Sequence, residues 1–142
     1  MSAPTIRDVM EAYAEDAESD ARKRGVSLDY SEASLAQVDG ILETITANGV
    51  LTPKSSAEED GLWMLAKIYG GYVGQVVIKQ MGGEWQLQDL PDGGSRVVLL
   101  WSGIQAFPPE KIFKRLTKDR FSGVGGYCRA LRAIIENREK KG

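Results

Sequence analysis

The chain of 142 residues contains no histidine and a single cysteine, Cys128. Without histidine it lacks the commonest general base and metal ligand, which excludes histidine-dependent catalysis and Cys/His zinc binding. Hydrophobic residues make up 42% and charged residues 27% of the chain, as is typical of globular proteins. The length fits one domain, so we expect residues 1–142 to form a single domain in which 139–142 are a frayed tail.

Charge is distributed unevenly along the chain. Residues 1–60 hold 13 acidic and 5 basic side chains, whereas residues 61–142 hold 7 acidic and 13 basic ones. The net charge of −2 therefore conceals an acidic N-terminal part and a basic C-terminal part. Such asymmetry bears on the choice of partner and not on the fold.

The sequence also indicates the compartment. The N-terminal residues show no basic segment followed by an apolar run, which argues against a secretory signal. No stretch reaches the roughly 20 apolar residues that a membrane helix requires. A single cysteine forms no internal disulfide, which is compatible with a reducing compartment. We therefore expect a cytoplasmic protein without membrane contact.

An amphipathic helix is predicted for residues 4–24. Apolar residues recur along one side at steps of three and four, and Gly25 ends the pattern. The opposite side carries an acidic stripe, which consists of Asp8, Glu11, Glu15 and Glu18. This acidic stripe is either a solvated outer face, favoured near a helix N-terminus by the helix dipole, or a surface for a partner.

Two further helices are predicted before residue 82. The second begins after Ser31, a favourable N-cap, and ends at the Asn-Gly pair 48–49. The third spans residues 57–81, and Ser56 with Glu59 forms a capping-box pattern at its start. Small residues recur every four positions in this third helix, at 66, 70 and 74, so we expect another backbone to approach it closely there.

The period of the apolar residues changes to two after Gly82-Gly83. Trp85 and Leu87 alternate with glutamines, a Pro-Asp-Gly-Gly turn follows at 91–94, and residues 97–101 are all apolar. A second tight turn at 102–103 leads into a short strand at 104–107. These signals predict a three-stranded antiparallel β-meander, whose apolar face we expect the third helix to cover.

The C-terminal third is predicted to form two helices that carry most of the basic residues. Pro108-Pro109 starts the fourth helix, and the last helix follows the glycine-rich segment 123–126. The candidate anion-binding residues on these helices are Lys111, Lys114, Arg115, Lys118, Arg129 and Arg132. Altogether the sequence predicts an α+β fold with about five helices packed around the three-stranded sheet.

Two local features of the sequence are candidate chemical sites. Cys128 falls on the apolar side of the last helix, which indicates a core cysteine rather than a nucleophile. The glycines at 123, 125 and 126 could present N–H groups to an anion, but the segment lacks the spacing of nucleotide-binding loops and follows a helix instead of a strand. A flexible start of the last helix is the better interpretation. We predict no catalytic residue, no metal site and no cofactor.

Several segments resemble a group of small bacterial proteins of uncharacterised function. They are Leu-Asp-Tyr-Ser at 28–31, Ile-Tyr-Gly-Gly-Tyr-Val-Gly at 68–74, Gly-Gly-Glu-Trp at 82–85, Phe-Pro at 107–108 and Tyr-Cys-Arg-Ala-Leu at 127–131. The resemblance spans most of the chain and rests on packing and turn residues. It implies a shared α+β fold and a bacterial cytosolic origin, and it carries no catalytic residue.

Two classes of function follow as hypotheses. We favour a non-enzymatic protein-binding module, in concrete terms an immunity-type inhibitor whose acidic stripe covers the basic active site of a toxin. The alternative is a small-ligand or anion-binding protein, conceivably an enzyme, that uses Trp85, Trp101 and the basic residues of the last two helices. Complementary acidic and basic stripes would also allow a homo-oligomer or a contact within one chain. The pI of 5.3 argues against a dedicated nucleic-acid binder.

Overall fold

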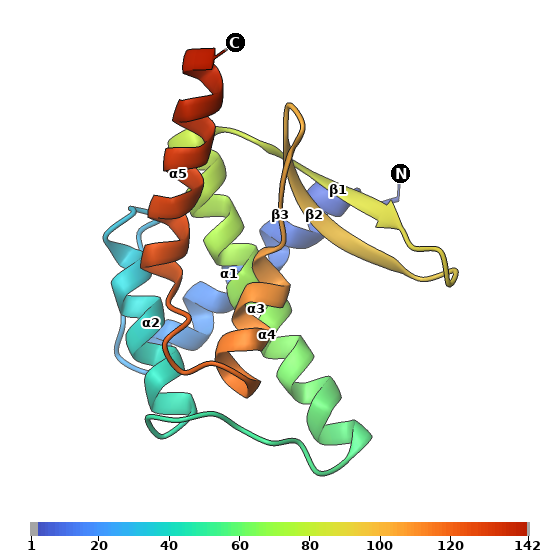
Figure 1. The fold of residues 1–142 in the computed structure, drawn as a ribbon. Helices are drawn as coiled ribbons and strands as arrows, with labels where there is room; N and C mark the ends of the chain where they lie inside the picture. Colours follow the sequence, from blue (N-terminus) through green and yellow to red (C-terminus); the bar gives the residue numbers. More distant parts are fainter. Residues whose placement is uncertain (1–2, 142) are drawn as a thin grey trace.

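The computed structural model describes residues 3–141, which form five helices and one three-stranded antiparallel sheet (Figure 1). The helices are α1 (Ile6–Lys23), α2 (Ser34–Ile45), α3 (Ser56–Met81), α4 (Pro108–Thr117) and α5 (Val124–Lys141). The strands are β1 (Glu84–Asp89), β2 (Ser95–Trp101) and β3 (Ile104–Ala106). The predicted α+β fold class is confirmed. Within the described residues, every helix is too short or too polar to cross a membrane.

Helix ends differ slightly from the prediction. The N-cap of α3 is Ser55 and not Ser56, because Ser55 accepts a hydrogen bond from the N–H of Glu58 at 3.1 Å. The sequence offers the capping pattern in two adjacent frames, and the first is used. Helix α2 begins at Ser34, whose N–H donates to the hydroxyl of Ser31 at 3.1 Å. Helix α5 is assigned as far as Lys141, the fraying of residues 139–142 stays a prediction, and residue 142 lies outside the described residues.

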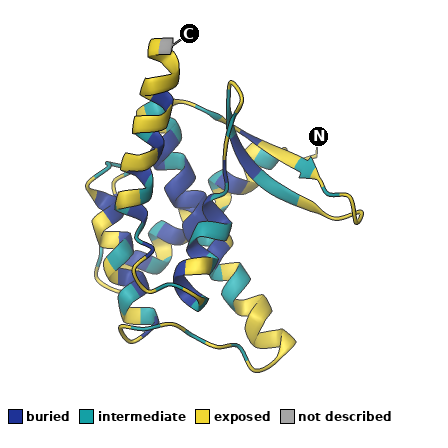
Figure 2. Cartoon of the chain, in the orientation of Figure 1, coloured by how far each residue is buried: buried dark blue, intermediate teal, exposed yellow. Residues whose placement is uncertain are grey.

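Helix α3 is the centre of the core, with α1 and α4 packed against it (Figure 2). Its glycines set the closeness of these contacts. A Cβ placed on Gly70 would lie 2.6 Å from both N and Cα of Pro109 at the start of α4. A Cβ on Gly71 would lie 2.9 Å from the carbonyl oxygen of Met10 in α1. The predicted close approach of another backbone to α3 is thus confirmed at Gly70, and Gly71 provides a second such contact.

The sheet has the order β1-β2-β3 and is anchored to α3 by Trp85. Trp85 pairs with Leu99 across the β1–β2 ladder and is 4% exposed. Its indole ring packs over Gly74 of α3, and its Nε1–H donates to Oε1 of Gln75 at 2.8 Å. Helix α3 therefore covers part of the sheet, as expected, while α1 packs against β1 and α4 against β2. The turn end of the β1–β2 hairpin projects away from the helices (Figure 1).

Candidate functional site

A groove lies where α1, α3, α4 and the β1–β2 hairpin meet, and its volume is about 550 Å³. Most of its wall is apolar. The side chains that line it come from α1 (Ile6, Val9, Met10, Tyr13), α3 (Trp63, Lys67), α4 (Pro109, Glu110) and the hairpin (Leu87, Leu90, Ser95, Arg96, Val97). Its size is in the range of about 300–1,000 Å³ that is usual for sites of small molecules. We call it the hairpin groove.

The hairpin groove gathers apolar side chains that the core leaves uncovered. Leu87 is on the same face of β1 as the buried Trp85, but it is two residues nearer the turn, where the hairpin projects away from the helices. Leu87 is accordingly 57% exposed, and Val9 on the facing side of α1 is 36% exposed. Exposed apolar side chains that converge on one hollow are typical of a binding surface.

The charged groups of the hairpin groove are two cations and one carboxylate. The Nε–H of Arg96 donates to Oε1 of Gln88 at 2.9 Å, and its guanidinium lies 4.1 Å from the centre of the Phe107 ring. One oxygen of Glu110 lies 3.9 Å from Nη1 of Arg96. Lys67 is exposed, and within residues 3–141 its ammonium makes no ion pair or hydrogen bond. The lining of the groove is therefore net positive.

The structure places the acidic stripe on the outside of α1 and gives two of its members local tasks. Asp8 completes a capping box with Thr5: its carboxylate accepts from the Thr5 N–H at 2.9 Å, and the Thr5 hydroxyl accepts from the Asp8 N–H at 3.1 Å. These hydrogen bonds hold the pKa of Asp8 below its ordinary value. Glu11 accepts from Nε of Arg7 at 2.9 Å. Both carboxylates thus stabilise the first turns of α1.

The other two members of the acidic stripe differ from each other. Glu18 accepts a hydrogen bond from the hydroxyl of Tyr30 at 2.7 Å. Tyr30 has a φ of 63°, and its N–H donates to the hydroxyl of Tyr72 at 2.8 Å, so Glu18 helps to hold a strained loop in place. Glu15 is exposed and makes no ion pair or hydrogen bond among the described residues. It is the member of the stripe most open to a partner.

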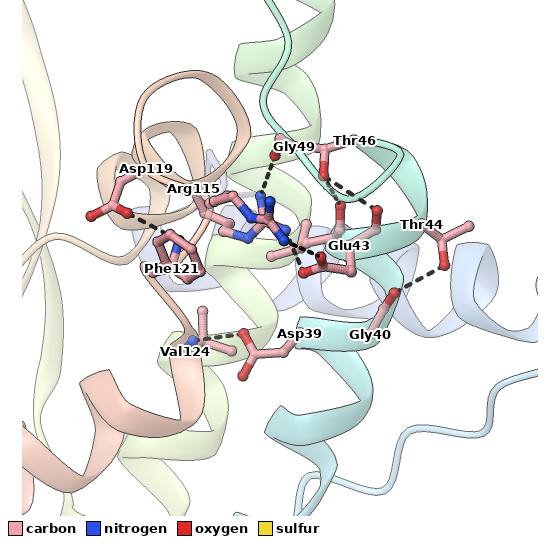
Figure 3. A network of polar contacts seen from close by, with 12 residues as sticks. Asp39, Gly40, Glu43, Thr44, Thr46, Gly49, Arg115, Asp119, Phe121 and Val124 are labelled. Carbon is pink, nitrogen blue, oxygen red and sulfur yellow. Dashed lines mark hydrogen bonds and ion pairs between the residues drawn. The ribbon is translucent and has the colours of Figure 1, made fainter.

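The sequence predicts Arg115 as a candidate anion-binding residue, but the structure buries it. Arg115 is 2% exposed. Its Nη2 donates to Oε2 of Glu43 at 2.8 Å, and its Nη1 donates to the carbonyl oxygen of Gly49 at 3.0 Å (Figure 3). The reason is its place on α4, since Arg115 follows the buried Ile112 by three residues and so shares its face. Arg115 is a structural residue that ties α4 to the end of α2.

The other candidate anion-binding residues lie on or just after α4 and on α5, and two of them have partners within the protein. Lys111 donates to the hydroxyl of Ser122 and lies 5.3 Å from the centre of the Tyr127 ring, and its partial burial lowers the pKa of its ammonium. Nη1 of Arg132 lies 2.7 Å from Oε1 of Glu32. The members that remain exposed are Lys114, Lys118 and Arg129. None of these residues lines the hairpin groove.

The N-terminus of α5 is occupied by a carboxylate of the protein itself. Asp39 of α2 accepts from the N–H of Val124 at 2.7 Å (Figure 3) and from that of Gly125 at 3.3 Å. A Cβ on Gly123 would lie 3.3 Å from Oδ2 of Asp39, so the glycine allows this carboxylate to approach. The carboxylate of Asp39 therefore caps the N-terminus of α5, and the glycine-rich segment leaves room for it. Sequence reasoning missed Asp39 because it is separated from Val124 by 85 residues.

The acidic and basic parts of the chain meet through α2 and its flanking loop rather than through α1. Glu32 pairs with Arg132 and Glu43 with Arg115, whereas the ion pairs of α1 within residues 3–141 are local ones. The contact expected within one chain between the acidic stripe of α1 and the basic residues of α4 is thus not among the ion pairs of the described residues.

The two tryptophans of the sheet line different hollows. Trp85 lines one with the start of α1, and Trp101 lines another with Arg138 of α5. Neither hollow includes Arg129 or Arg132. The small-ligand alternative requires both tryptophans and the basic residues of the last two helices to line one site, and these two hollows do not meet that requirement. The hairpin groove is lined by Trp63 instead and was not predicted.

Cys128 is a core residue, as predicted, with an exposed fraction of 0%. Its thiol donates to Oε1 of Glu32 at 3.4 Å, and burial raises its pKa to about 11. The thiol is therefore protonated at neutral pH and is a weak nucleophile. Over residues 3–141, the structure contains no group of three or more cysteine and acidic side chains that could hold a metal ion.

Comparison with known proteins found no matching sequence family, no matching curated protein and no matching solved structure. The resemblance to small bacterial proteins stays a prediction.

Proposed function

We propose that the protein is a non-enzymatic binding module that holds a small, largely apolar ligand in the hairpin groove. The observation that carries this proposal is the convergence of Val9 and Leu87, two exposed apolar side chains from separate elements, on one hollow of about 550 Å³. Covering such side chains with a ligand removes apolar surface from water and so favours binding. The groove is also bounded by four elements of one core, which makes it a preformed site.

The chemistry of the lining favours binding over catalysis. The carboxylate of Glu110 lies beside the guanidinium of Arg96, at 3.9 Å, so their charges offset each other. The thiol of Cys128, the single cysteine of the chain, is buried in the core and is not part of the lining. The polar groups of the groove are therefore suited to orienting a ligand.

Leu87→Gln tests the hairpin groove with a neutral apolar probe, N-phenyl-1-naphthylamine, whose fluorescence rises in apolar surroundings. Because Leu87 is 57% exposed, we expect its replacement to change stability by no more than about 0.5 kcal/mol. We expect the affinity for the probe to fall about tenfold, the result of losing roughly 1.4 kcal/mol of apolar contact. A fluorescence titration measures the affinity of the wild-type protein and of Leu87→Gln for the probe.

The matched control is Ile134→Gln, because Ile134 is 52% exposed on α5 and does not line the groove. It should leave the affinity for N-phenyl-1-naphthylamine unchanged. If the two variants bind the probe equally, the hairpin groove is not the binding site and the proposed function is wrong.

A second candidate function is protein binding through the acidic stripe, as in an immunity-type inhibitor of a toxin. It is supported by Glu15, which is exposed and makes no ion pair or hydrogen bond among the described residues. The carboxylates of Asp8, Glu11 and Glu18 lie on the same side of α1 and make local contacts there, so acidic groups gather on the outside of this helix. Such a surface would meet a basic partner and mainly accelerate their encounter.

Glu15→Lys tests this second candidate, since it reverses a charge without breaking an internal contact. In affinity capture from a lysate of the source organism, we expect a stoichiometric partner to be retained by the wild-type protein at low salt. Its affinity for Glu15→Lys should be lower by about tenfold or more, because like charges then face each other. Asp16→Lys, the same change at an exposed neighbour outside the stripe, is the control. Equal retention by both variants would remove the stripe as the binding surface.

A further inference from the structure

The hairpin groove is lined by cations from two walls, Lys67 of α3 and Arg96 of β2. One carboxylate, Glu110 of α4, lies among them, so the lining has one positive charge in excess. Binding an apolar body in the groove displaces water from this wall, and an uncompensated charge then loses part of its hydration. A neutral ligand would leave that charge unbalanced.

Lys67 is the available cation of the groove. Within residues 3–141 its ammonium makes no hydrogen bond or ion pair, and the residue is exposed. The four-carbon stem of a lysine can lie along apolar surface while the ammonium stays at the edge. Lys67 can therefore reach an anionic group of a ligand without giving up an existing contact.

Arg96 is already held in position. Its Nε–H donates to Gln88 at 2.9 Å, and its guanidinium stacks over the ring of Phe107. Its Nη1 is 3.9 Å from Glu110, which is longer than a hydrogen bond. The terminal N–H groups can thus donate to an anionic oxygen, and because the side chain is preorganised, it loses little conformational freedom on binding.

We infer that the ligand of the hairpin groove is an amphipathic monoanion, with an apolar body and one carboxylate or sulfonate group that Lys67 and Arg96 recognise. This inference rests on the proposed function. One negative charge balances the excess charge of the lining, whereas a neutral or doubly charged ligand leaves a charge uncompensated in an apolar site. The rings of Trp63 and Tyr13 provide flat apolar walls for the body of the ligand.

The test compares two probes that differ by one sulfonate, 1-anilinonaphthalene-8-sulfonate and N-phenyl-1-naphthylamine. We expect the wild-type protein to bind the sulfonate about tenfold more tightly, an advantage that should shrink as salt is added. Lys67→Gln should weaken sulfonate binding about fivefold to tenfold and leave the neutral probe within about twofold. Lys79→Gln is the matched control, because Lys79 is an exposed lysine of the same helix that does not line the groove.

The outcomes separate this inference from the proposed function. If both probes bind equally and Lys67→Gln changes neither affinity, the ligand is not selected by charge, and the hairpin groove stays the proposed site. The same conclusion follows if Lys79→Gln weakens sulfonate binding as much as Lys67→Gln does. If neither probe binds, both the inference and the proposed function are wrong.

Discussion

Replacing Glu43 by alanine is expected to lower the free energy of unfolding by about 3–5 kcal/mol, although the side chain of Glu43 is itself 40% exposed. The reason is its partner. Arg115 is 2% exposed, and the loss of the carboxylate leaves its guanidinium with the carbonyl oxygen of Gly49 as its hydrogen-bond acceptor within residues 3–141. A buried charge without a counter-charge costs several kcal/mol.

The pair also connects distant parts of the chain. Glu43 lies in the last turns of α2, Gly49 follows that helix, and Arg115 lies on α4 (Figure 3). Next to Arg115, the carbonyl oxygen of Leu116 accepts from the N–H of Leu51 at 2.7 Å. Losing the ion pair therefore weakens the seam between α4 and the segment after α2.

A thermodynamic cycle distinguishes a buried charge from a simple lost contact. Arg115→Met removes the charge and keeps much of the volume, and Glu43 can then be hydrated, so we expect a cost of about 1–2 kcal/mol, mainly from the unpaired carbonyl of Gly49. In that background Glu43→Ala should cost less than about 1 kcal/mol. Urea denaturation of the four proteins measures these values. If Glu43→Ala costs the same in both backgrounds, Arg115 does not depend on the carboxylate.

The elements themselves could be predicted because each has a local signal. The helix expected at 4–24 is Ile6–Lys23, and the one expected at 57–81 is Ser56–Met81. Apolar periodicity, capping residues and turn residues act over a few positions, so a sequence displays them directly. The small residues of α3 also predicted one feature of the packing, namely that another backbone approaches this helix closely.

The site could not be predicted, because it depends on how the elements are placed in space. The basic pattern of α4 gave no sign that the face bearing Arg115 would be covered, since its partners Glu43 and Gly49 lie more than sixty residues away. The hairpin groove lies between the helices and the β1–β2 hairpin, whose turn end projects away from them. No local sequence pattern specifies this placement of the hairpin. The sequence did contain one signal, the apolar Leu87, which is two residues nearer the turn than Trp85 and on the same face of the strand.

Adding one methyl group at Gly70 is expected to destabilise the protein by about 2–4 kcal/mol. The new Cβ would lie 2.6 Å from N and Cα of Pro109 and 3.0 Å from its Cγ. Two of these atoms belong to the backbone, so relief requires a shift of the first turn of α4 as a whole. Alanine favours a helix over glycine by about 1 kcal/mol, which is too little to offset this overlap.

Gly61→Ala is the control for this prediction, and its effect should have the opposite sign. Gly61 is an exposed residue of the same helix, and apart from its chain neighbours and the backbone of its own helix no atom lies within 4 Å of its added Cβ, so we expect stabilisation by about 0.5–1 kcal/mol. Thermal denaturation of both variants and of the wild-type protein measures these changes in stability. Because Pro109 also lines the hairpin groove, Gly70→Ala should in addition weaken binding of N-phenyl-1-naphthylamine, whereas Gly61→Ala should not. Stabilisation by both variants would contradict the seating of α4 on α3 and, with it, the shape of the groove.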